Sequence, residues 1–558
     1  MSFLLAEPDC ITTAAANIEG IGSALTSASA AAAAPTSAVL AAAADEVSAA
    51  IANAFGAYGQ EYQAVLTQIS AFQNQFQLSL AAAATAYANA ETAIATGLQG
   101  LLGGAPGQTF APTAAALPPF PPNPVSIIMG GTGVPIPTAK LINGALNLYI
   151  RPDAQNPTVS FPLVTPEQLY PLTGVRSLTL NASVQEGLTI LDNTLYEQIV
   201  TLNKPVTVFG ISQSAIIASL EMRNLMAGTS IFGANPPDPS MLNFVLTGNE
   251  MNPNGGMLSR FPGLNLAALG LDFYGATPSN TPYHVANYTL EYDGFADFPR
   301  YPINFLADLN ALAGIVFVHP TYFDLTMAHV DSAVQLPTSP GYTGNTSYYV
   351  IPTENLPLLA PLRAVPVIGN PLANLIQPDL KVLVNLGYGD PYHGYSTSYA
   401  DVPTPFGLFP EVPPHVIAEA LVAGTQQGIH DFTRDVQLLA ANPVTLPSFT
   451  PPSTGDLMTA ALKLPSPEKL VNTVASIISD DYAVLLPTAD IGLSFVTAMP
   501  LYNAQLFVEQ LAQGNLINAF GYPIAADIGL ATIAGGVEGL TILAALSNNV
   551  KDIQGLFA

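Results

Sequence analysis

The sequence predicts an α/β protein with an N-terminal α-helical hairpin, a central domain built on a mostly parallel sheet, and a helical C-terminal extension. Through the first hundred residues, apolar positions recur every three or four residues, which is the spacing of one helix face. From residue 125 onward, short apolar runs alternate with helical segments, as in a parallel sheet covered by helices. The predicted segments are residues 1–100, 101–124, 125–400 and 401–558.

The composition is apolar and acidic. Of the 558 residues, 49% are hydrophobic and only 9% are charged, whereas soluble domains carry about a quarter charged residues. The 13 Lys and Arg against 39 Asp and Glu give a net charge of −26, which leaves no basic face for nucleic acid or for an anionic lipid surface. The first basic residue is Lys140, so neither a Sec signal peptide nor a mitochondrial transit peptide is expected.

Two further absences are expected. Cys10 is the only cysteine, so the fold does not depend on an intrachain disulfide. The two most apolar stretches, 27–44 and 533–547, are interrupted by proline, glycine or glutamate. We therefore expect no integral membrane span.

The first segment predicts two long helices. Their apolar stripes run from Ile11 to Leu25 and from Leu40 to Phe76, and Pro35 separates them. Two helices cannot bury both stripes by themselves, so we expect a partner surface to cover the remainder. Residues 101–124 are rich first in Gly and then in Pro, which indicates a linker.

The central segment is predicted to alternate strands with helices. The predicted strands are 125–129, 205–209, 241–246, 285–292 and 382–386. One helix is predicted from a capping box at Ser183–Glu186 to Leu202, and another over 214–226 before Gly228. The extension is predicted to contain four helices, at 414–442, 465–478, 502–513 and 527–546.

The sharpest chemical signal is Gly210-Ile211-Ser212-Gln213-Ser214, which follows a predicted strand and precedes a predicted helix. A nucleophile elbow needs this strand–turn–helix context, and small residues two before and two after the serine let strand and helix approach. A second G-x-S-x-S match, Gly394–Ser398, has no helix after it. Ser212 is therefore the candidate nucleophile of an α/β-hydrolase domain; the alternative is a turn of small residues.

A serine nucleophile needs a base and an orienting acid, which in α/β-hydrolases follow in the order serine, acid, histidine. Asp293 and Asp297 follow the strand predicted at 285–292, and we prefer Asp297 as the acid. His319 is the next histidine along the chain; the alternative for it is a helix-end histidine bonded to carbonyl groups. A rival acid–base pair follows the strand predicted at 382–386: Asp390 and His393.

An oxyanion hole needs two backbone N–H groups. One is expected from Gln213, directly after the nucleophile, and the other from Gly131 or Thr132, in the glycine loop after the first strand. No metal-ligand spacing, Walker motif or dinucleotide fingerprint is present in the sequence, so we expect no metal and no cofactor.

The first hundred residues resemble the N-terminal PE domain of the mycobacterial PE family. The resemblance is carried by Met1-Ser2-Phe3, by Pro8-Asp9 in place of the family's Pro-Glu, and by the Ala-rich hairpin. Tyr87 and Glu91 match the Y-x-x-x-[DE] signal of type VII secretion. The resemblance implies a secreted, cell-wall or cell-surface protein, with a PPE-type helical partner and a secretion chaperone for the hairpin.

Residues 125–400 resemble the PE-PPE domain, a serine α/β-hydrolase domain related to cutinases. The motifs that carry this resemblance are the Ser212 pentapeptide, Met129–Gly133, Thr165–Leu169 and Tyr292–Pro299. In addition, the sequence from His319 to Tyr322 resembles the H-x-x-Y around a cutinase's catalytic histidine, which favours His319 over His393. Cutinases are disulfide-bonded and this chain cannot be, which places it nearer the PE-PPE branch.

This second resemblance implies a secreted serine esterase or lipase acting on an acyl ester or lipid through Ser212, His319 and Asp297. One alternative is transfer of the acyl group to a sugar, as in a trehalose glycolipid; another is a cell-surface interaction protein without catalysis. We also expect the apolar helices of residues 401–558 to form a lid or an apolar wall over the site.

Overall fold

The computed structural model describes residues 124–150, 159–174, 176–441 and 466–557, all within one compact unit, Pro118–Ala558. The predicted helical hairpin, the linker up to residue 123, Cys10 and the Tyr87/Glu91 pair lie outside the described residues.

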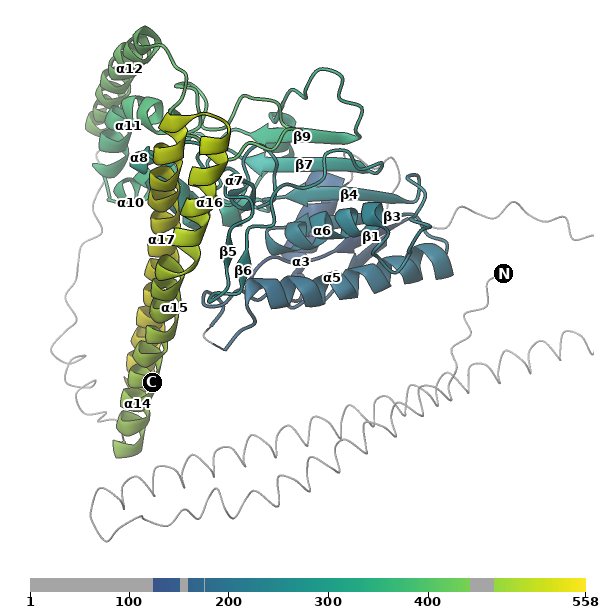
Figure 1. Cartoon of the computed structure of the whole chain (residues 1–558). Helices are drawn as coiled ribbons and strands as arrows, with labels where there is room; N and C mark the ends of the chain where they lie inside the picture. Colours follow the sequence, from purple (N-terminus) through teal and green to yellow (C-terminus); the bar gives the residue numbers. More distant parts are fainter. Residues whose placement is uncertain (1–123, 151–158, 175, 442–465, 558) are drawn as a thin grey trace, which may run out of the picture. The chain divides into compact units, whose positions relative to one another are not determined.

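A seven-stranded sheet forms the centre of the fold, in the order β2-β1-β3-β4-β7-β9-β8. Figure 1 shows β1, β3, β4, β7 and β9 of this sheet. Every neighbouring pair is parallel except β8 with β9. The strands are β1 Val125–Ile128, β2 Val159–Pro162, β3 Val206–Ile211, β4 Leu242–Thr247, β7 His284–Leu290, β8 Val334–Gln335 and β9 Thr346–Ile351. A separate antiparallel pair is formed by β5 Asn265–Leu266 and β6 Leu271–Asp272. The predicted α/β class with a mostly parallel sheet is confirmed.

Four strands lie within two residues of their predicted positions, namely β1, β3, β4 and β7, whereas β2 and β9 were not predicted. The strand predicted at 382–386 is wrong, because this segment lies in and just after the last turns of helix α11, Gly369–Asn385. Val382 and Val384 are buried there as helical residues. A short apolar run has the same appearance in a buried strand and in a buried helix end.

Helices cover both faces of the sheet. On one face lie α5, Leu180–Tyr196, and α6, Gln213–Ala227; on the other lie α3, Ala139–Gly144, and the π-helical turns that continue it, Ala145–Ile150. Glu197–Thr201 continues α5 as a π-helix. Among the described residues before 400, the remaining helices are α7 Met257–Arg260, α8 Phe305–Phe317, the 3-10 turn His319–Thr321, α9 Met327–Asp331, the 3-10 turn Pro357–Leu359 and α10 Ala360–Arg363.

The start of α5 differs from its prediction. Thr179 caps this helix by accepting a hydrogen bond from the N–H of Ala182, so Ser183 already lies inside the first turn. The hydroxyl of Ser183 instead donates to Oε1 of Gln213 at 2.6 Å. The predicted capping box is therefore wrong. Its serine instead binds the side chain of Gln213, the residue after the candidate nucleophile. Helix α6 ends at Gly228 in the left-handed conformation, as predicted.

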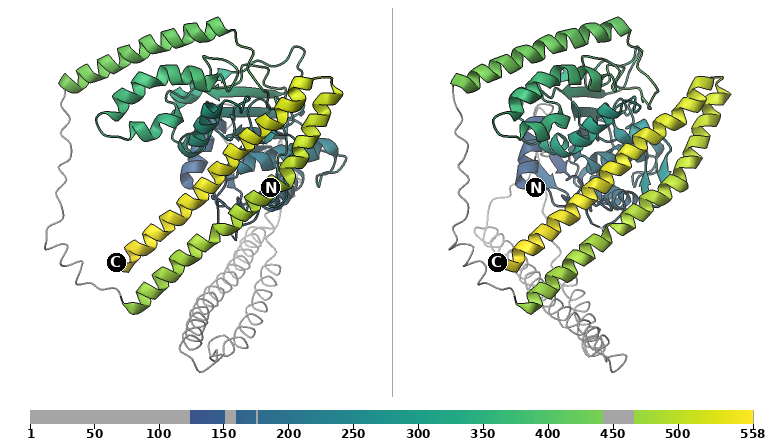
Figure 2. Two further views of the ribbon diagram at one scale, coloured as in Figure 1. Left: turned by 60° about the vertical axis from the view of Figure 1, so that its left-hand side comes forward. Right: turned by 90° about the vertical axis from the view of Figure 1, so that its left-hand side faces the viewer.

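The C-terminal extension is helical, as predicted. Helix α12, Pro414–Ala441, packs on α11. Three consecutive helices form one arm of a long antiparallel pair: α14 Pro467–Ala483, α15 Leu485–Val496 and α16 Ala498–Ala512. The other arm is α17, Leu516–Phe557, which lies along the first and contacts α8 of the central domain (Figure 2).

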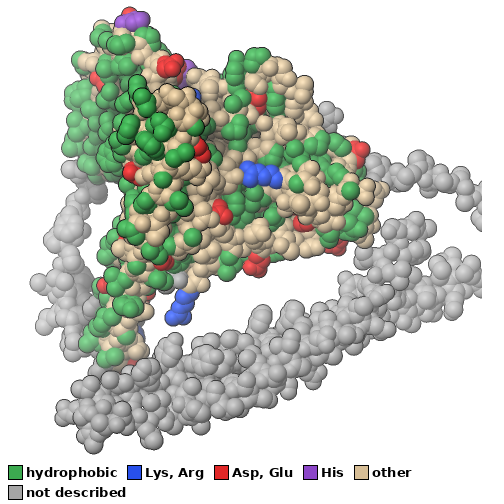
Figure 3. Space-filling view, viewed as in Figure 1, with side chains coloured by type: hydrophobic (Ala, Val, Ile, Leu, Met, Phe, Trp, Pro, Cys, Tyr) green, Lys and Arg blue, Asp and Glu red, His purple; other side chains and the backbone are tan. Residues whose placement is uncertain are grey.

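Apolar side chains cover much of the exposed surface of this helical pair (Figure 3). Two helical stretches, Glu468–Ala512 and Leu516–Leu556, are long and apolar enough to cross a membrane by length and composition. Buried side chains of the same stretches, including Tyr502 and Leu530, belong to the core of the central domain. The expected absence of a membrane span stays a prediction.

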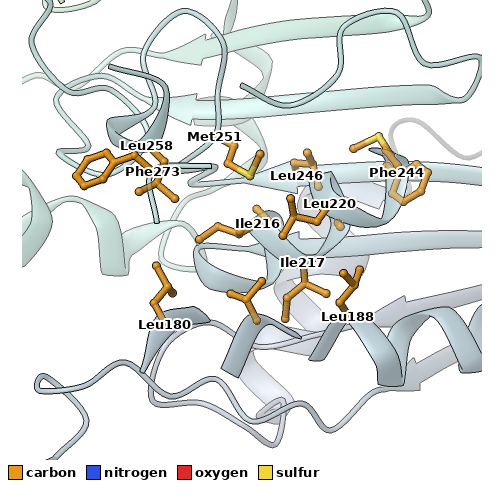
Figure 4. Packing of buried hydrophobic residues seen from close by; sticks show 14 of the residues in the cluster. Leu180, Leu188, Ile216, Ile217, Leu220, Phe244, Leu246, Met251, Leu258 and Phe273 are labelled. Atoms are coloured by element: carbon orange, nitrogen blue, oxygen red, sulfur yellow. The ribbon is translucent and has the colours of Figure 1, made fainter. Parts of the chain in front are cut away.

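The main core lies between the sheet and helices α5 and α6 (Figure 4). Alternate residues of β3 point to opposite faces: Val206 and Val208 enter this core, whereas Phe209 and Ile211 pack on the α3 side. Because both faces are covered, β3 is buried along its whole length. The carboxyl end of this strand is thereby held rigidly where the candidate nucleophile follows.

Candidate active site

Ser212 lies on a sharp turn between β3 and α6, as predicted. Its φ of 55° and ψ of −126° place it in a strained region that non-glycine residues rarely adopt. The N–H of Ser212 donates to the carbonyl of Thr247, at the end of the neighbouring strand β4, over 3.2 Å. This backbone holds the hydroxyl at the carboxyl edge of the sheet, above the N-terminus of α6.

The two small residues that flank the turn each have a physical reason. A Cβ at Gly210 would lie 2.7 Å from the carbonyl oxygen of Ser214, so only glycine fits the close approach of strand and helix. The hydroxyl of Ser214 donates to the carbonyl of Ile211 at 3.0 Å and accepts from its N–H at 2.8 Å. A serine where glycine is commoner therefore fastens the turn.

His319 and Asp293 form the acid–histidine pair of the site. Nδ1 of His319 lies 2.9 Å from each carboxylate oxygen of Asp293. The hydroxyl of Tyr322 donates to the same carboxylate at 2.8 Å, and the N–H of Phe295 donates to it at 3.0 Å. The carboxylate is fully buried, and these donors fix its position against the imidazole.

The preference for Asp297 over Asp293 as the partner of His319 is corrected by this geometry. Asp297 is also buried, but its Oδ2 accepts from the N–H of Tyr292 at 3.1 Å, within its own turn. Burial raises the pKa of Asp297 well above its ordinary value, while the nearby Arg260 guanidinium acts in the opposite direction. Asp297 therefore helps to close the loop that presents Asp293.

Gly248 and Glu250, in the loop that follows β4, lie between Ser212 and His319. A Cβ at Gly248 would lie 2.9 Å from Cε1 of His319, so the imidazole packs on this glycine, one residue after the Thr247 carbonyl that binds Ser212. Oε1 of Glu250 accepts a hydrogen bond from Oγ of Ser212 at 3.2 Å. Glu250 is close enough to His319 for their charges to interact. The serine, the histidine and Glu250 thus share one site.

The titration of this site is set by burial and by its carboxylates. Burial raises the pKa of Glu250 to about 7, although the charge of His319 and the hydrogen bond from Ser212 lower it. For His319, burial lowers the pKa, but the carboxylates of Asp293 and Glu250 outweigh it, so the pKa is raised above 6.5. An imidazole of raised pKa, held at Nδ1 by a carboxylate, can take a proton at Nε2.

The residues predicted for the oxyanion hole lie around Ser212. A Cβ at Gly131 would be 3.1 Å from Cβ of Ser212, so this glycine lets the loop after β1 approach the nucleophile. Gln213 is the first residue of α6, and an N–H at that position has no partner within its helix. Nε2 of Gln213 donates to Oγ1 of Thr132 at 3.2 Å, which joins the two sides of the predicted hole.

The rival residues are placed elsewhere. Asp390 and His393 do pair with each other, with Oδ1 and Nδ1 3.1 Å apart, but both are partly exposed, at 29% and 44% of their side chains. Ser396, in the second G-x-S-x-S match, follows no strand and precedes no helix, and its Oγ lies 2.9 Å from Oγ of Ser398. Within the described ranges, no group of three or more His, Cys, Asp and Glu is arranged to hold a metal ion.

Sequence reasoning missed two buried glutamates of this region. Glu250 follows the strand next to the nucleophile strand, and that position was the available signal. Glu167 adopts a φ of 47°, and its carbonyl accepts from the N–H of Gly133, in the glycine loop. Burial raises the pKa of Glu167 to about 8, and the charge of Glu250 contributes. No sequence signal marked Glu167 beyond its place in the motif Thr165–Leu169.

The fold and this site together define an α/β protein with an elbow serine and a histidine–aspartate pair at the carboxyl edge of its sheet. Comparison with known families matches residues 4–94 to the PE family and residues 156–389 to the PE-PPE domain. The second match contains Ser212, Glu250, Asp293 and His319 and ends before α12.

Curated relatives from Mycobacterium tuberculosis extend these matches. The PE family protein PE3 is 44% identical over 431 residues, covering 77% of this chain and 87% of the relative. The protein named esterase PE16 is 44% identical over 429 residues, covering 75% of each chain. The uncharacterized PPE family protein PPE28 is 49% identical over 449 residues, covering 77% of this chain and 67% of the relative. The chain belongs to the mycobacterial PE family and carries a PE-PPE domain.

Proposed function

We propose that this protein is a serine esterase of the lipase type, which hydrolyses acyl esters through an acyl-enzyme at Ser212. The observation that carries the proposal is the strained elbow at Ser212 together with the His319–Asp293 pair, to which Glu250, the hydrogen-bond acceptor of Ser212, is close enough for an electrostatic interaction. A relative with 44% identity carries the name esterase PE16, which supports the same class of reaction.

In the proposed mechanism, Oγ of Ser212 attacks the ester carbonyl and gives its proton to Nε2 of His319. Asp293 holds Nδ1 and stabilises the imidazolium that forms. The N–H of Gln213, together with that of Gly131 or Thr132, stabilises the oxyanion. His319 then protonates the leaving alcohol, and water, deprotonated by the same imidazole, releases the acid and restores Ser212.

Ester hydrolysis by matched serine variants tests the proposal. We expect Ser212→Ala to lower kcat/KM for p-nitrophenyl butyrate by at least about 10³-fold, as for removal of a triad member. Ser396→Ala, in the second pentapeptide match, is the control and should retain activity within about threefold. Equal activity of the wild-type protein and the folded Ser212→Ala variant would contradict the proposal.

We also propose that the PE segment serves export by type VII secretion and pairs with a PPE-type helical protein. The match to the PE family over residues 4–94 supports this role, as do relatives from both the PE and the PPE families. Replacing Tyr87 and Glu91 by alanine should keep the protein out of the culture filtrate of a mycobacterial host, while Ser212→Ala should be exported normally. Export of the Tyr87/Glu91 double variant at the wild-type level would contradict this role.

A further inference from the structure

A cavity of about 350 Å³ lies between the central domain and the C-terminal helices. On the side of the central domain its wall includes Leu180, Leu258 and Phe273, which lie at one end of the core in Figure 4. On the other side the wall is built by α15, α16 and α17, from Ile491 to Leu543. Neither the core nor the helical pair encloses this space alone.

The chemistry of the wall is almost wholly apolar. Leucine, isoleucine, valine, methionine and phenylalanine side chains dominate the wall, and Glu250 is its one charged side chain. Water gains few partners in such a space, whereas an alkyl chain gains the free energy of leaving water. A largely apolar pocket with one polar end is a common form of ligand site.

Two contacts join the polar end of the cavity to the candidate catalytic residues. Glu250, in the wall, accepts a hydrogen bond from Oγ of Ser212. Phe295, also in the wall, packs edge-on against His319, with ring centroids 4.8 Å apart. An acyl chain whose carbonyl is held at Ser212 would therefore pass these two residues and enter the cavity.

We propose that this cavity binds the acyl chain of the substrate and that the C-terminal helices complete its wall. The inference rests on the proposed esterase function and names its substrate class as medium- to long-chain acyl esters. The cavity has space for many water-sized groups, and a methylene group is close to water in size, so the cavity has room for an extended alkyl chain.

Glycines of α17 show how the helix reaches the cavity. A Cβ at Gly536 would lie 2.5 Å from Cδ2 of Leu312 on α8, so glycine permits close packing of the two helices. A Cβ at Gly539, which also lines the cavity, would meet nothing within 4 Å. A larger side chain at position 539 has room to form and would narrow the space.

Binding of uncharged acyl amides to the full chain with Ser212→Ala tests the proposal without requiring turnover. Each methylene that leaves water adds about fourfold in affinity, so decanamide, with four more methylenes, should bind about 250-fold more tightly than hexanamide. Adding Gly539→Leu, or in a second variant Ala534→Leu, should weaken decanamide at least tenfold and leave hexanamide within threefold. Gly555→Leu is the matched control on the same helix, because position 555 is exposed, has open space and does not line the cavity.

The proposal is overturned if decanamide and hexanamide bind equally, or if both cavity variants bind decanamide as the Gly555→Leu control does. If the wild-type protein shows no esterase activity but the amides bind in the expected pattern, the cavity assignment holds and the proposed function is wrong. If the wild-type protein is an esterase but the amides do not bind in that pattern, the proposed function holds and the cavity assignment is wrong.

Discussion

The imidazole of His319 lies against both carboxylate oxygens of Asp293 at 2.9 Å, and the hydroxyl of Tyr322 binds one of them at 2.8 Å. The three residues come from two loops that follow β7 and α8, at the same edge of the sheet as Ser212. In the proposed mechanism, this contact favours Asp293 over Asp297 as the orienting acid.

Substitution of Asp293 and of Asp297, the two aspartates after β7, should have different effects on kcat. Asp293→Asn should lower kcat by about 10³- to 10⁴-fold, because the amide no longer stabilises the imidazolium or fixes its tautomer. Asp297→Asn should keep kcat within tenfold, since this side chain binds the N–H of Tyr292 and not His319. Steady-state ester hydrolysis, with circular dichroism to verify folding, measures both. A larger loss of kcat for Asp297→Asn than for Asp293→Asn would reverse the assignment.

Gly248 and Gly233 offer a matched pair, because both have a φ of 56°. Alanine at either position should lower the free energy of unfolding by about 1 kcal/mol, from backbone strain. Only at Gly248 would the new Cβ meet His319, at 2.9 Å, whereas at Gly233 it would meet nothing within 4 Å. We therefore expect Gly248→Ala to lose more than tenfold in kcat/KM and Gly233→Ala to retain it. Equal activities would show that His319 is not held by this contact.

Glu250→Gln should shift the pH profile of ester hydrolysis. The base must be neutral, so activity rises with pH through the pKa of His319, which the carboxylates of Asp293 and Glu250 raise. Glutamine keeps a hydrogen-bond acceptor for Ser212 but removes one negative charge, so the acidic limb of kcat/KM should move to lower pH, by a few tenths to about one pH unit. The other acidic neighbours, Asp293 and Glu167, remain in the variant. If the acidic limb of the kcat/KM profile stays in place or moves to higher pH, the claim that the charge of Glu250 acts on His319 is wrong.

Stability should fall as pH rises from about 5 to 8, with Glu221 as a principal cause. Burial and the negative charge of Asp192 raise the pKa of Glu221 from 4.5 to about 9. Between these values the folded state holds a proton that the unfolded state has lost, so rising pH favours unfolding. Glu221→Gln should flatten the pH dependence of urea denaturation, and Glu186→Gln, at an exposed position of α5, should not. The same slope in all three proteins would show that Glu221 titrates normally.

The sequence was sufficient for features set locally. Ser212 was predictable because a buried strand, a tight turn and a helix follow each other within a few residues. The choice between Asp293 and Asp297 was not, because both follow β7 and the outcome depends on a turn in which the N–H of Asp297 binds the carbonyl of Asp293 at 2.6 Å. The sequence does not show which of the two carboxylates faces a histidine that follows Asp293 by 26 residues.

Sequence reasoning missed Glu250 and wrongly predicted a strand at 382–386 for the same physical reason. Glu250 approaches Ser212 only because β4 lies beside β3 in the sheet, which is a tertiary relationship. The run from Val382 to Leu386 is apolar enough for a strand, but packing within the fold makes it the end of a helix. In both cases tertiary contacts determined a feature that the local sequence pattern does not specify.

Covalent labelling of Ser212 by a fluorophosphonate tests the central claim most directly. The reagent modifies serines that an adjacent base activates, so the folded wild-type protein should gain one adduct, located by mass spectrometry on the peptide that contains Ser212. Ser212→Ala should gain none, and Asp293→Asn should react far more slowly. A folded wild-type protein that gains no adduct, or that gains it only at another serine such as Ser396, would contradict the account.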